Sequence, residues 1–273
     1  MSFKNPSLTS AAALAACLLI APAQAQTTPA PADAKPAEPA KPTEPYTITG
    51  NFGIYSQYVF RGLTQTDTKP AFQGGFDWAH TSGFYLGTWG SNISWIKDPN
   101  PSTCSHGCSL EWDLYGGYKY AFNDDWGMDV GVLYYYYPGS YIGGATKPNT
   151  TEIYIAGSWK WASLKYSHSV DDTFGIPNSK NSWYLDASAN YPINDAWTLN
   201  AHVGRQEYKG SNGGFSNGDF LNYTDWKLGA TWLYNGYNIG AYYSDTNAKD
   251  AGYVIAGKNI GKSTGTVFIQ KTF

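Results

Sequence analysis

Apolar and polar residues alternate along most of this chain. From about residue 46 to residue 273, stretches of roughly ten residues place an aromatic or aliphatic side chain at every second position, with polar residues or glycine between. A period of two predicts β-strands that have one dry face and one wet face. About twelve such stretches can be delimited, at residues 46–61, 71–79, 83–93, 110–122, 126–137, 151–161, 162–170, 182–191, 197–206, 223–233, 237–245 and 265–273.

Two all-β architectures fit this alternation, a soluble sandwich and a transmembrane barrel. The connections alternate between short turns, at residues 80–82, 123–125, 161–162, 192–196 and 235–236, and long loops, at residues 62–69, 92–109, 138–150, 171–181, 207–222 and 246–264. A sandwich has no reason to sort its connections by length, whereas outer-membrane barrels combine short periplasmic turns with long external loops and an even strand number. We therefore predict an antiparallel transmembrane β-barrel of about twelve strands with both termini periplasmic.

Composition supports the barrel. Aromatic residues make up 17% of the chain and charged residues only 14%, which is low for a fully solvated surface. The mean hydropathy is nonetheless negative, as expected where only alternate residues meet lipid. A net charge of −3 argues against nucleic acid as a partner.

The first 45 residues have the character of export and linker segments. Lys4, the apolar run 11–21 and the Ala23-Gln24-Ala25 sequence indicate a signal peptide over residues 1–25. Residues 26–45 form a Pro/Ala-rich tract that is too polar to form a core, so we interpret them as a linker, with contact to peptidoglycan as an alternative. The barrel domain is then expected over residues 46–273 in the outer membrane of a Gram-negative bacterium.

Two cysteines remain after the predicted signal peptide. Cys104 and Cys108 flank a short Ser-His-Gly segment, and in an oxidising compartment this spacing favours a small disulfide in an external loop. A metal site with His106 would need a further ligand nearby. We expect neither a bound metal nor a cofactor.

Several segments resemble one protein family. These are YSQYVFRGLTQTDTKPAFQGGFDW (residues 55–78), GFYLGTWGSN (83–92), LEWDLYGGY (110–118), YYYYPG (134–139), TEIYIA (151–156) and LKYSHS (164–169). Together they resemble the TorF family, a conserved proteobacterial family of outer-membrane barrels of unknown function to which a channel role is attributed. The resemblance implies a porin-like barrel, but it names no solute.

The C-terminal segment carries a further pattern. Phe273 as the final aromatic residue, with Ile269 and Val267 on the same parity, matches the strand that the barrel-assembly machinery recognises. Lys271 departs from that pattern, because an apolar residue is usual at its position.

If the apolar parity faces lipid, the opposite parity lines the lumen. Charged residues on that parity are Asp77, Glu111, Asp113, Lys119, Asp129, Glu152, Lys160, Lys165, Asp186, Asp225 and Lys227. Lys or Arg on the lipid face near the midplane would cost about 2–4 kcal/mol, so this sorting is physically meaningful. The acidic excess predicts a wet passage with a mild cation preference, and the alternative is that these groups pair into a network that fills the barrel.

Arg61 ends the first predicted strand at its outer rim and precedes a polar loop. It could fold that loop inward and form a constriction, or it could cap strand carbonyl groups at the rim. His168 and His202 raise the alternative of an outer-membrane lipase. Ser167 and Ser169 must point to the face opposite His168, although a serine from a neighbouring strand could reach it. We therefore predict a porin that passes small hydrophilic solutes or ions by passive diffusion and has no catalytic residues; a non-conducting structural or receptor barrel is the main alternative.

Overall fold

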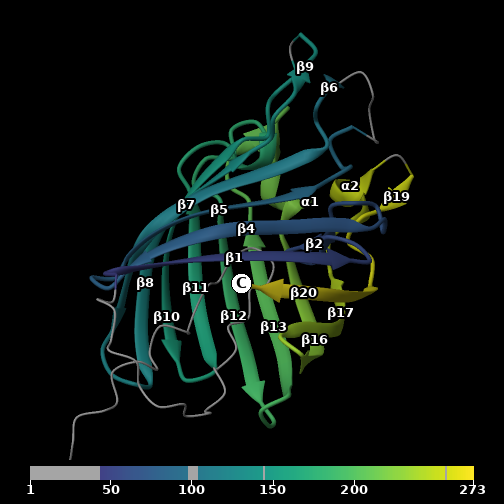
Figure 1. Cartoon of the computed structure of the whole chain (residues 1–273). Coiled ribbons are helices and arrows are strands. Elements are labelled where there is room, and N and C mark those ends of the chain that lie inside the picture. The colour runs from purple at the N-terminus through teal and green to yellow at the C-terminus, as the bar shows by residue number, and fades with distance from the viewer. Residues whose placement is uncertain (1–43, 98–103, 144, 256) are drawn as a thin grey trace, which may run out of the picture.

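A computed structural model describes residues 44–97, 104–143, 145–255 and 257–273. The predicted signal peptide and most of the predicted linker lie outside these residues. Within them, twelve antiparallel strands close into one barrel in the order β1-β20-β17-β16-β13-β12-β11-β10-β8-β7-β5-β4 (Figure 1). The strands are β1 (Tyr46–Tyr55), β4 (Ala71–His80), β5 (Phe84–Asn92), β7 (Leu110–Ala121), β8 (Trp126–Tyr136), β10 (Thr150–Trp159), β11 (Ala162–Ser169), β12 (Trp183–Pro192), β13 (Trp197–Glu207), β16 (Tyr223–Tyr234), β17 (Tyr237–Thr246) and β20 (Thr264–Thr272).

The predicted twelve-stranded antiparallel fold is confirmed, with one clear error in a strand boundary. The first strand was expected to run to Arg61, but β1 ends at Tyr55. Tyr58 and Phe60, which continue the apolar parity of β1, do not face lipid, and Tyr58 is only 1% exposed. The chain leaves the barrel wall after Tyr55 and turns inward, so the alternation continues beyond the end of the strand.

Apolar side chains cover the outside of the barrel and polar side chains line its inside. Exposed large apolar side chains cover the outer wall, including Ile48, Phe76, Leu86, Leu228 and Val267. Buried polar side chains line the inner wall, including Gln73, Glu111, Asn200, Asp225 and Gln270. Aromatic pairs such as Trp126–Trp159 and Trp197–Trp232 lie beside the short turns. A surface of this kind matches a bilayer with an interfacial aromatic girdle.

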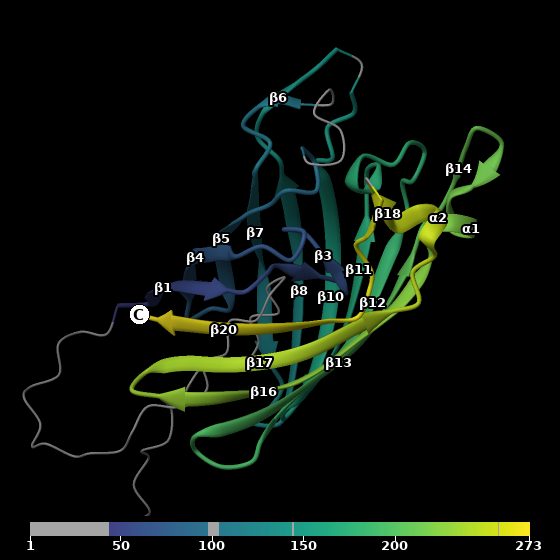
Figure 2. The same cartoon turned by 90° about the vertical axis from the view of Figure 1, so that its right-hand side faces the viewer.

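The two ends of the barrel differ, and we call them the turn end and the loop end. The loop end carries β2 (Val59–Phe60), β3 (Leu63–Thr64), β6 (Cys104–His106), β9 (Ser140–Tyr141), η1 (Thr173–Gly175), β14 (Ser211–Asn212), β15 (Phe215–Ser216), α1 (Asn217–Leu221), α2 (Asp250–Tyr253), β18 (Val254–Ile255) and β19 (Lys258–Asn259). Apart from β2 and β3, these elements gather beyond one rim of the barrel, away from the tight turns (Figure 2). No helix in the described residues is long and apolar enough to cross a membrane.

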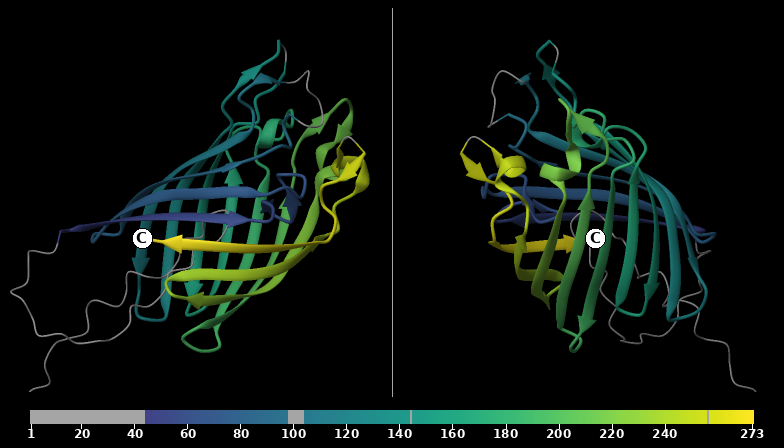
Figure 3. Two further views of the ribbon diagram at one scale, coloured as in Figure 1. Left: turned by 45° about the vertical axis from the view of Figure 1, so that its right-hand side comes forward. Right: turned by 180° about the vertical axis from the view of Figure 1, so that it is seen from behind.

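Strands β1 and β20 close the barrel. Their register joins Asn51 to Thr272 through Tyr55 to Phe268. Phe273 continues the pairing, because its backbone exchanges hydrogen bonds of 2.8 and 2.9 Å with Gly50. Figure 3 shows β20 between β1 and β17 in the wall. Lys271 lies on the outer face, where its ammonium is 4.8 Å from the ring centroid of Tyr237.

Several inward aromatic rings lie against glycines of the neighbouring strand. Tyr154 of β10 pairs in register with Gly131 of β8, and a Cβ built on Gly131 would lie 2.6 Å from the Cζ atom of Tyr154. The same arrangement recurs at Tyr85–Gly117, Tyr115–Gly87, Tyr242–Gly229 and Phe268–Gly240. Each glycine leaves room for a ring to lie along the wall instead of projecting across the lumen.

Candidate functional site

The loop that follows β1 enters the barrel. We call residues 56–70 loop L1; it contains the two-residue strands β2 and β3. Its side chains include Gln57, Tyr58, Gln65 and Thr66, which are at most 7% exposed. L1 therefore lies across the lumen at the loop end, not on the outer surface.

Contacts with several strands hold L1 in place. The Tyr58 hydroxyl donates to Glu111 Oε1 of β7 at 2.6 Å, and the second Glu111 oxygen accepts from the Tyr137 hydroxyl at 2.8 Å. Farther along L1, the backbone of Thr64 donates to the Ile260 carbonyl at 2.9 Å. The first of these contacts joins L1 to the wall, and the last joins it to the final long loop.

Arg61 makes the central contacts of L1. Its Nη2 atom lies 3.0 and 2.8 Å from the two oxygens of Glu152 on β10, and its Nη1 atom donates to Gln206 Oε1 on β13 at 2.8 Å. The guanidinium carbon lies 4.2 Å from the ring centroid of Tyr184 on β12. Tyr135 and Phe174 complete the surroundings, and we call Tyr135, Glu152, Phe174, Tyr184 and Gln206 the Arg61 cage.

This pair is deeply buried, with the Arg61 and Glu152 side chains 7% and 1% exposed. Burial alone would lower the pKa of Arg61, but the Glu152 carboxylate raises this pKa well above its usual range. The guanidinium therefore stays charged at any physiological pH. Arg61 thus contacts the inner wall through Glu152 and Gln206, and the constriction considered for it stays a prediction.

L1 has an unusual backbone. Arg61, Asp67 and Thr68 have φ values of 47°, 52° and 60°, in the left-handed region that non-glycine residues seldom adopt. Each costs on the order of 1 kcal/mol or more and persists only where its surroundings impose it. Here the interactions of Arg61 with the barrel wall offset part of that cost.

A second charged cluster lies on β12, β13 and β16. His202 Nδ1 is 2.9 Å from Asp186 Oδ2, and its Nε2 is 2.8 Å from Asp225 Oδ1. The Ser188 hydroxyl donates to Asp186 at 2.6 Å, and the Tyr184 hydroxyl donates to Asp225 at 2.9 Å. His202 Nδ1 also lies 3.2 Å from the Ser188 hydroxyl, so the imidazole bridges two carboxylates and contacts a serine of the neighbouring strand.

Most of the predicted lumen residues lie on the inner wall. Those that are at most 8% exposed are Asp77, Glu111, Asp113, Asp129, Glu152, Lys165 and Asp225, and those that are half-buried are Lys119, Asp186 and Lys227. Many of the carboxylates accept a hydrogen bond from a tyrosine, as Asp77 does from Tyr115 at 2.6 Å and Asp129 from Tyr85 at 2.7 Å. The inner wall is thus a tyrosine–carboxylate surface with interspersed cations.

The prediction that Lys160 lines the lumen is wrong. Lys160 lies in the tight turn after β10, with a φ of 50° and an exposed side chain. Its ammonium is 3.6 Å from Asp125 Oδ2 in the neighbouring turn. The parity argument failed because the strand ends at Trp159, and parity has no meaning within a turn.

Asp113 differs from the other carboxylates. It is 0% exposed, and neither of its carboxylate oxygens has a hydrogen-bond partner among the described residues. In register it pairs with Trp89 on β5 and Tyr135 on β8. Glu111 and Glu152 interact with it electrostatically, so three acidic side chains lie close together on this part of the wall.

Two predicted features concern the loops. Cys104 and Cys108 form a disulfide with a Cα–Cα distance of 6.3 Å, in the segment that pairs β6 with β9 at the loop end. Among the described residues, no group of three His, Cys, Asp or Glu side chains is arranged to hold a metal ion. His168 contacts the Tyr166 hydroxyl and Asn181, each at 3.3 Å, and no serine.

Sequence reasoning missed the inward tyrosines and the lumen position of His202. Tyrosine was counted mostly with the lipid-facing residues, yet Tyr55, Tyr85, Tyr135 and Tyr184 are at most 5% exposed on the inner wall. Parity could have placed all of these except Tyr85, because each of the other three shares the parity of a charged or amide residue on its own strand. The contacts of L1 join residues far apart in sequence, and no local pattern encodes them.

Comparisons with known proteins agree with this fold. The model of a family described as "Bacterial protein of unknown function (Gcw_chp)" matches residues 39–273. Among solved structures, KdgM porin superposes with a TM-score of 0.51 at 11% identity, covering 82% of this chain and 99% of KdgM. NanC porin gives a TM-score of 0.49 at 12% identity, covering 83% and 98%. No curated protein sequence gives a significant match.

Proposed function

The chain belongs to the Gcw_chp family of bacterial proteins, and we propose that it is an outer-membrane porin that passes small hydrophilic solutes or ions by passive diffusion. One observation carries this proposal: a closed barrel with an apolar exterior has an inner wall of charged and hydroxyl-bearing side chains. Such a wall is compatible with water and hydrophilic solutes. The likeness to the KdgM fold fits this role.

The orientation follows from the lengths of the connections. We place the turn end and both chain termini in the periplasm and the loop end outside, with Cys104 and Cys108 external. The strand that ends at Phe273 is then the segment that the barrel-assembly machinery would recognise. We likewise propose that the chain is one of the TorF-family porins that its sequence resembles.

We also propose that the barrel has a mild preference for cations. Lys160 lies outside the lumen, so the acidic side chains of the inner wall are Asp77, Glu111, Asp113, Asp129, Glu152, Asp186 and Asp225. The basic side chains are Lys119, Lys165, Lys227, Arg61 and His202. Negative side chains along a narrow path raise the local concentration of cations. The position of L1 across the lumen is the observation that speaks for the second candidate, a non-conducting structural or receptor barrel.

Planar-bilayer recording of the purified full-length barrel tests the proposal. Stepwise conductance with a reversal potential that favours cations under a salt gradient is the expected result. Insertion without any conductance step, in repeated preparations that show heat-modifiable gel mobility, would leave the structural or receptor barrel. A phospholipid hydrolysis assay on the same preparations separates the lipase alternative.

A further inference from the structure

The Arg61 cage is built from the barrel wall. Tyr135, Glu152, Tyr184 and Gln206 come from β8, β10, β12 and β13, each within three residues of the loop end of its strand. Phe174 comes from the η1 turn beside β10. L1 itself adds only the ring of Phe60, 4.8 Å from the guanidinium carbon. The cage therefore does not depend on L1 for its construction.

The wall groups are oriented independently of Arg61. The Gln206 amide nitrogen donates to the Trp183 carbonyl at 3.1 Å, which directs its Oε1 atom toward the lumen. The Tyr135 hydroxyl is 3.4 Å from Glu152 Oε2 on the neighbouring strand. Because these contacts lie within the wall, the cage is pre-organised for a ligand.

The chemistry of the cage suits one class of ligand. It presents a carboxylate, an amide oxygen and the faces of aromatic rings, all of which attract a planar or compact organic cation. Guanidinium uses such sites best, because it donates several hydrogen bonds in one plane and also stacks on aromatic rings. A neutral or anionic group would leave Glu152 buried without a counter-charge.

The surrounding charges favour a cation as well. Glu111 and Asp113 lie on β7, and Asp113 has no hydrogen-bond donor among the described residues. Glu111 and Glu152 both interact electrostatically with Asp113. On the other side of Glu152, Lys165 of β11 interacts with Glu152, Asp129 and Asp186, and its ammonium lies 4.0 Å from the ring centroid of Tyr154.

In the structure, the positive group in the cage is the guanidinium of Arg61 from L1. The backbone of L1 is held in the left-handed region at Arg61, Asp67 and Thr68. We propose that the cage is a binding site for solutes bearing a guanidinium or primary ammonium group, and that Arg61 occupies it as an internal competitor. A cationic solute that takes the place of Arg61 frees L1 from the wall. This proposal rests on the proposed channel function, because it names the solute class that the channel would admit.

Equilibrium binding tests the site without relying on conductance. The probes are L-arginine and its uncharged analogue L-citrulline, titrated calorimetrically into the folded full-length barrel in detergent. We expect Arg61→Ala to bind arginine at least tenfold more tightly than the wild type does, and citrulline to give no binding in either. Adding Glu152→Gln to Arg61→Ala should remove arginine binding.

Two controls and one measurement on the native chain complete the design. Arg61→Lys keeps a cation in the cage and should bind arginine as weakly as the wild type. Arg205→Ala removes an arginine whose partner is Glu207, outside the cage, and should also match the wild type. If Arg61→Ala does not fold, hydrogen exchange of L1 in the wild type decides, because arginine should accelerate it and citrulline should not.

The possible failures are distinguishable. Equal binding of arginine and citrulline, arginine binding that survives Glu152→Gln, or L1 exchange unaffected by arginine would overturn the binding site. A barrel that binds arginine but never conducts would instead overturn the channel function and leave a receptor for cationic solutes.

Discussion

Arg61 and Glu152 lie 91 residues apart in sequence, yet one guanidinium nitrogen of Arg61 contacts both carboxylate oxygens of Glu152, at 2.8 and 3.0 Å. Around the barrel, β10 is five strands from β1, almost half of the circumference. The pair therefore anchors the first loop to the wall opposite its own strand.

Removing the anchor should open the barrel and destabilise it. We expect Arg61→Ala to raise single-channel conductance at least twofold, because L1 loses its contacts with β10 and β13. Breaking a buried ion pair costs about 3–5 kcal/mol, which urea titration of heat-modifiable gel mobility will detect. Unchanged conductance in a correctly inserted variant would show that L1 stays in the lumen without Arg61.

The acidic residues of β7 near L1, Glu111 and Asp113, should control ion selectivity. We expect Glu111→Gln combined with Asp113→Asn to lower the cation-to-anion permeability ratio at low salt, since Debye screening is weakest there. Glu152 is left intact because Arg61 already neutralises it. Reversal potentials under a salt gradient measure the ratio. Asp124→Asn, in an exposed turn, is the matched control; a ratio equal to that of the control would show that these acids carry no net charge.

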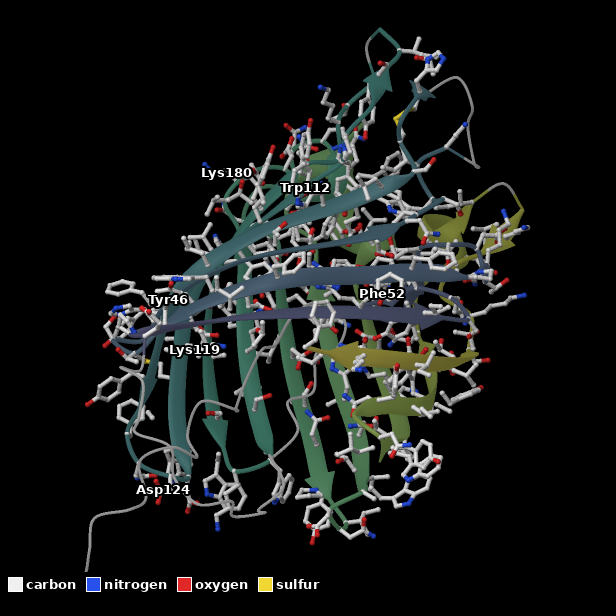
Figure 4. The ribbon with its side chains drawn as sticks, viewed as in Figure 1. Tyr46, Phe52, Trp112, Lys119, Asp124 and Lys180 are labelled. Atoms are coloured by element: carbon white, nitrogen blue, oxygen red, sulfur yellow. A yellow bond between two sulfur atoms is a disulfide. The ribbon has the colours of Figure 1, made fainter. Side chains whose placement is uncertain are left out.

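The orientation in the membrane can be read from two exposed positions. Lys180 lies at the loop end and Asp124 at the turn end (Figure 4). In a Cys104→Ser, Cys108→Ser background, a membrane-impermeant thiol reagent should label Lys180→Cys on intact cells, and Asp124→Cys only after lysis. The opposite result would invert the topology.

The glycines beneath the aromatic rings should tolerate no side chain. At Gly131 an added methyl group would lie 2.7 Å from the Gly116 carbonyl oxygen as well as against Tyr154. We expect Gly131→Ala to cost about 1–3 kcal/mol, in the range of overpacked cores. Urea midpoints in detergent test this, with Gly157→Ala as control because a Cβ there meets nothing within 4 Å. Equal midpoints for the two variants would show that the ring can move aside.

Alternation and connection lengths were sufficient to predict the barrel, its strand number and most of its inner wall. They worked because lipid and water impose opposite demands on adjacent residues, and each strand records that demand locally. The prediction failed where the wall ends. Lys160 lies in a turn and Tyr58 in an inward loop, although both continue the parity of a preceding strand.

The contacts of L1 could not be predicted in this way. Arg61 was recognised as a residue that could form a constriction, but its partners Glu152 and Gln206 are set by how the strands order around the barrel. His202 is a similar case, because Asp186 and Asp225 reach it from two neighbouring strands. Predicting such clusters requires the strand order and register, which cannot be read from a single sequence.

The aromatic rings that lie on glycines have a consequence for assembly. Backbone hydrogen bonds repeat every second residue, so a ladder shifted by two residues is almost as well bonded as the native one. A shift of two between β8 and β10 would set Tyr154 opposite Asp129 or Leu133 in place of Gly131, with no space for the ring. The same steric restriction holds for the pairs Tyr85–Gly117 and Tyr242–Gly229. These glycines therefore favour the native register sterically, where backbone hydrogen bonds alone would not distinguish it from a register shifted by two residues.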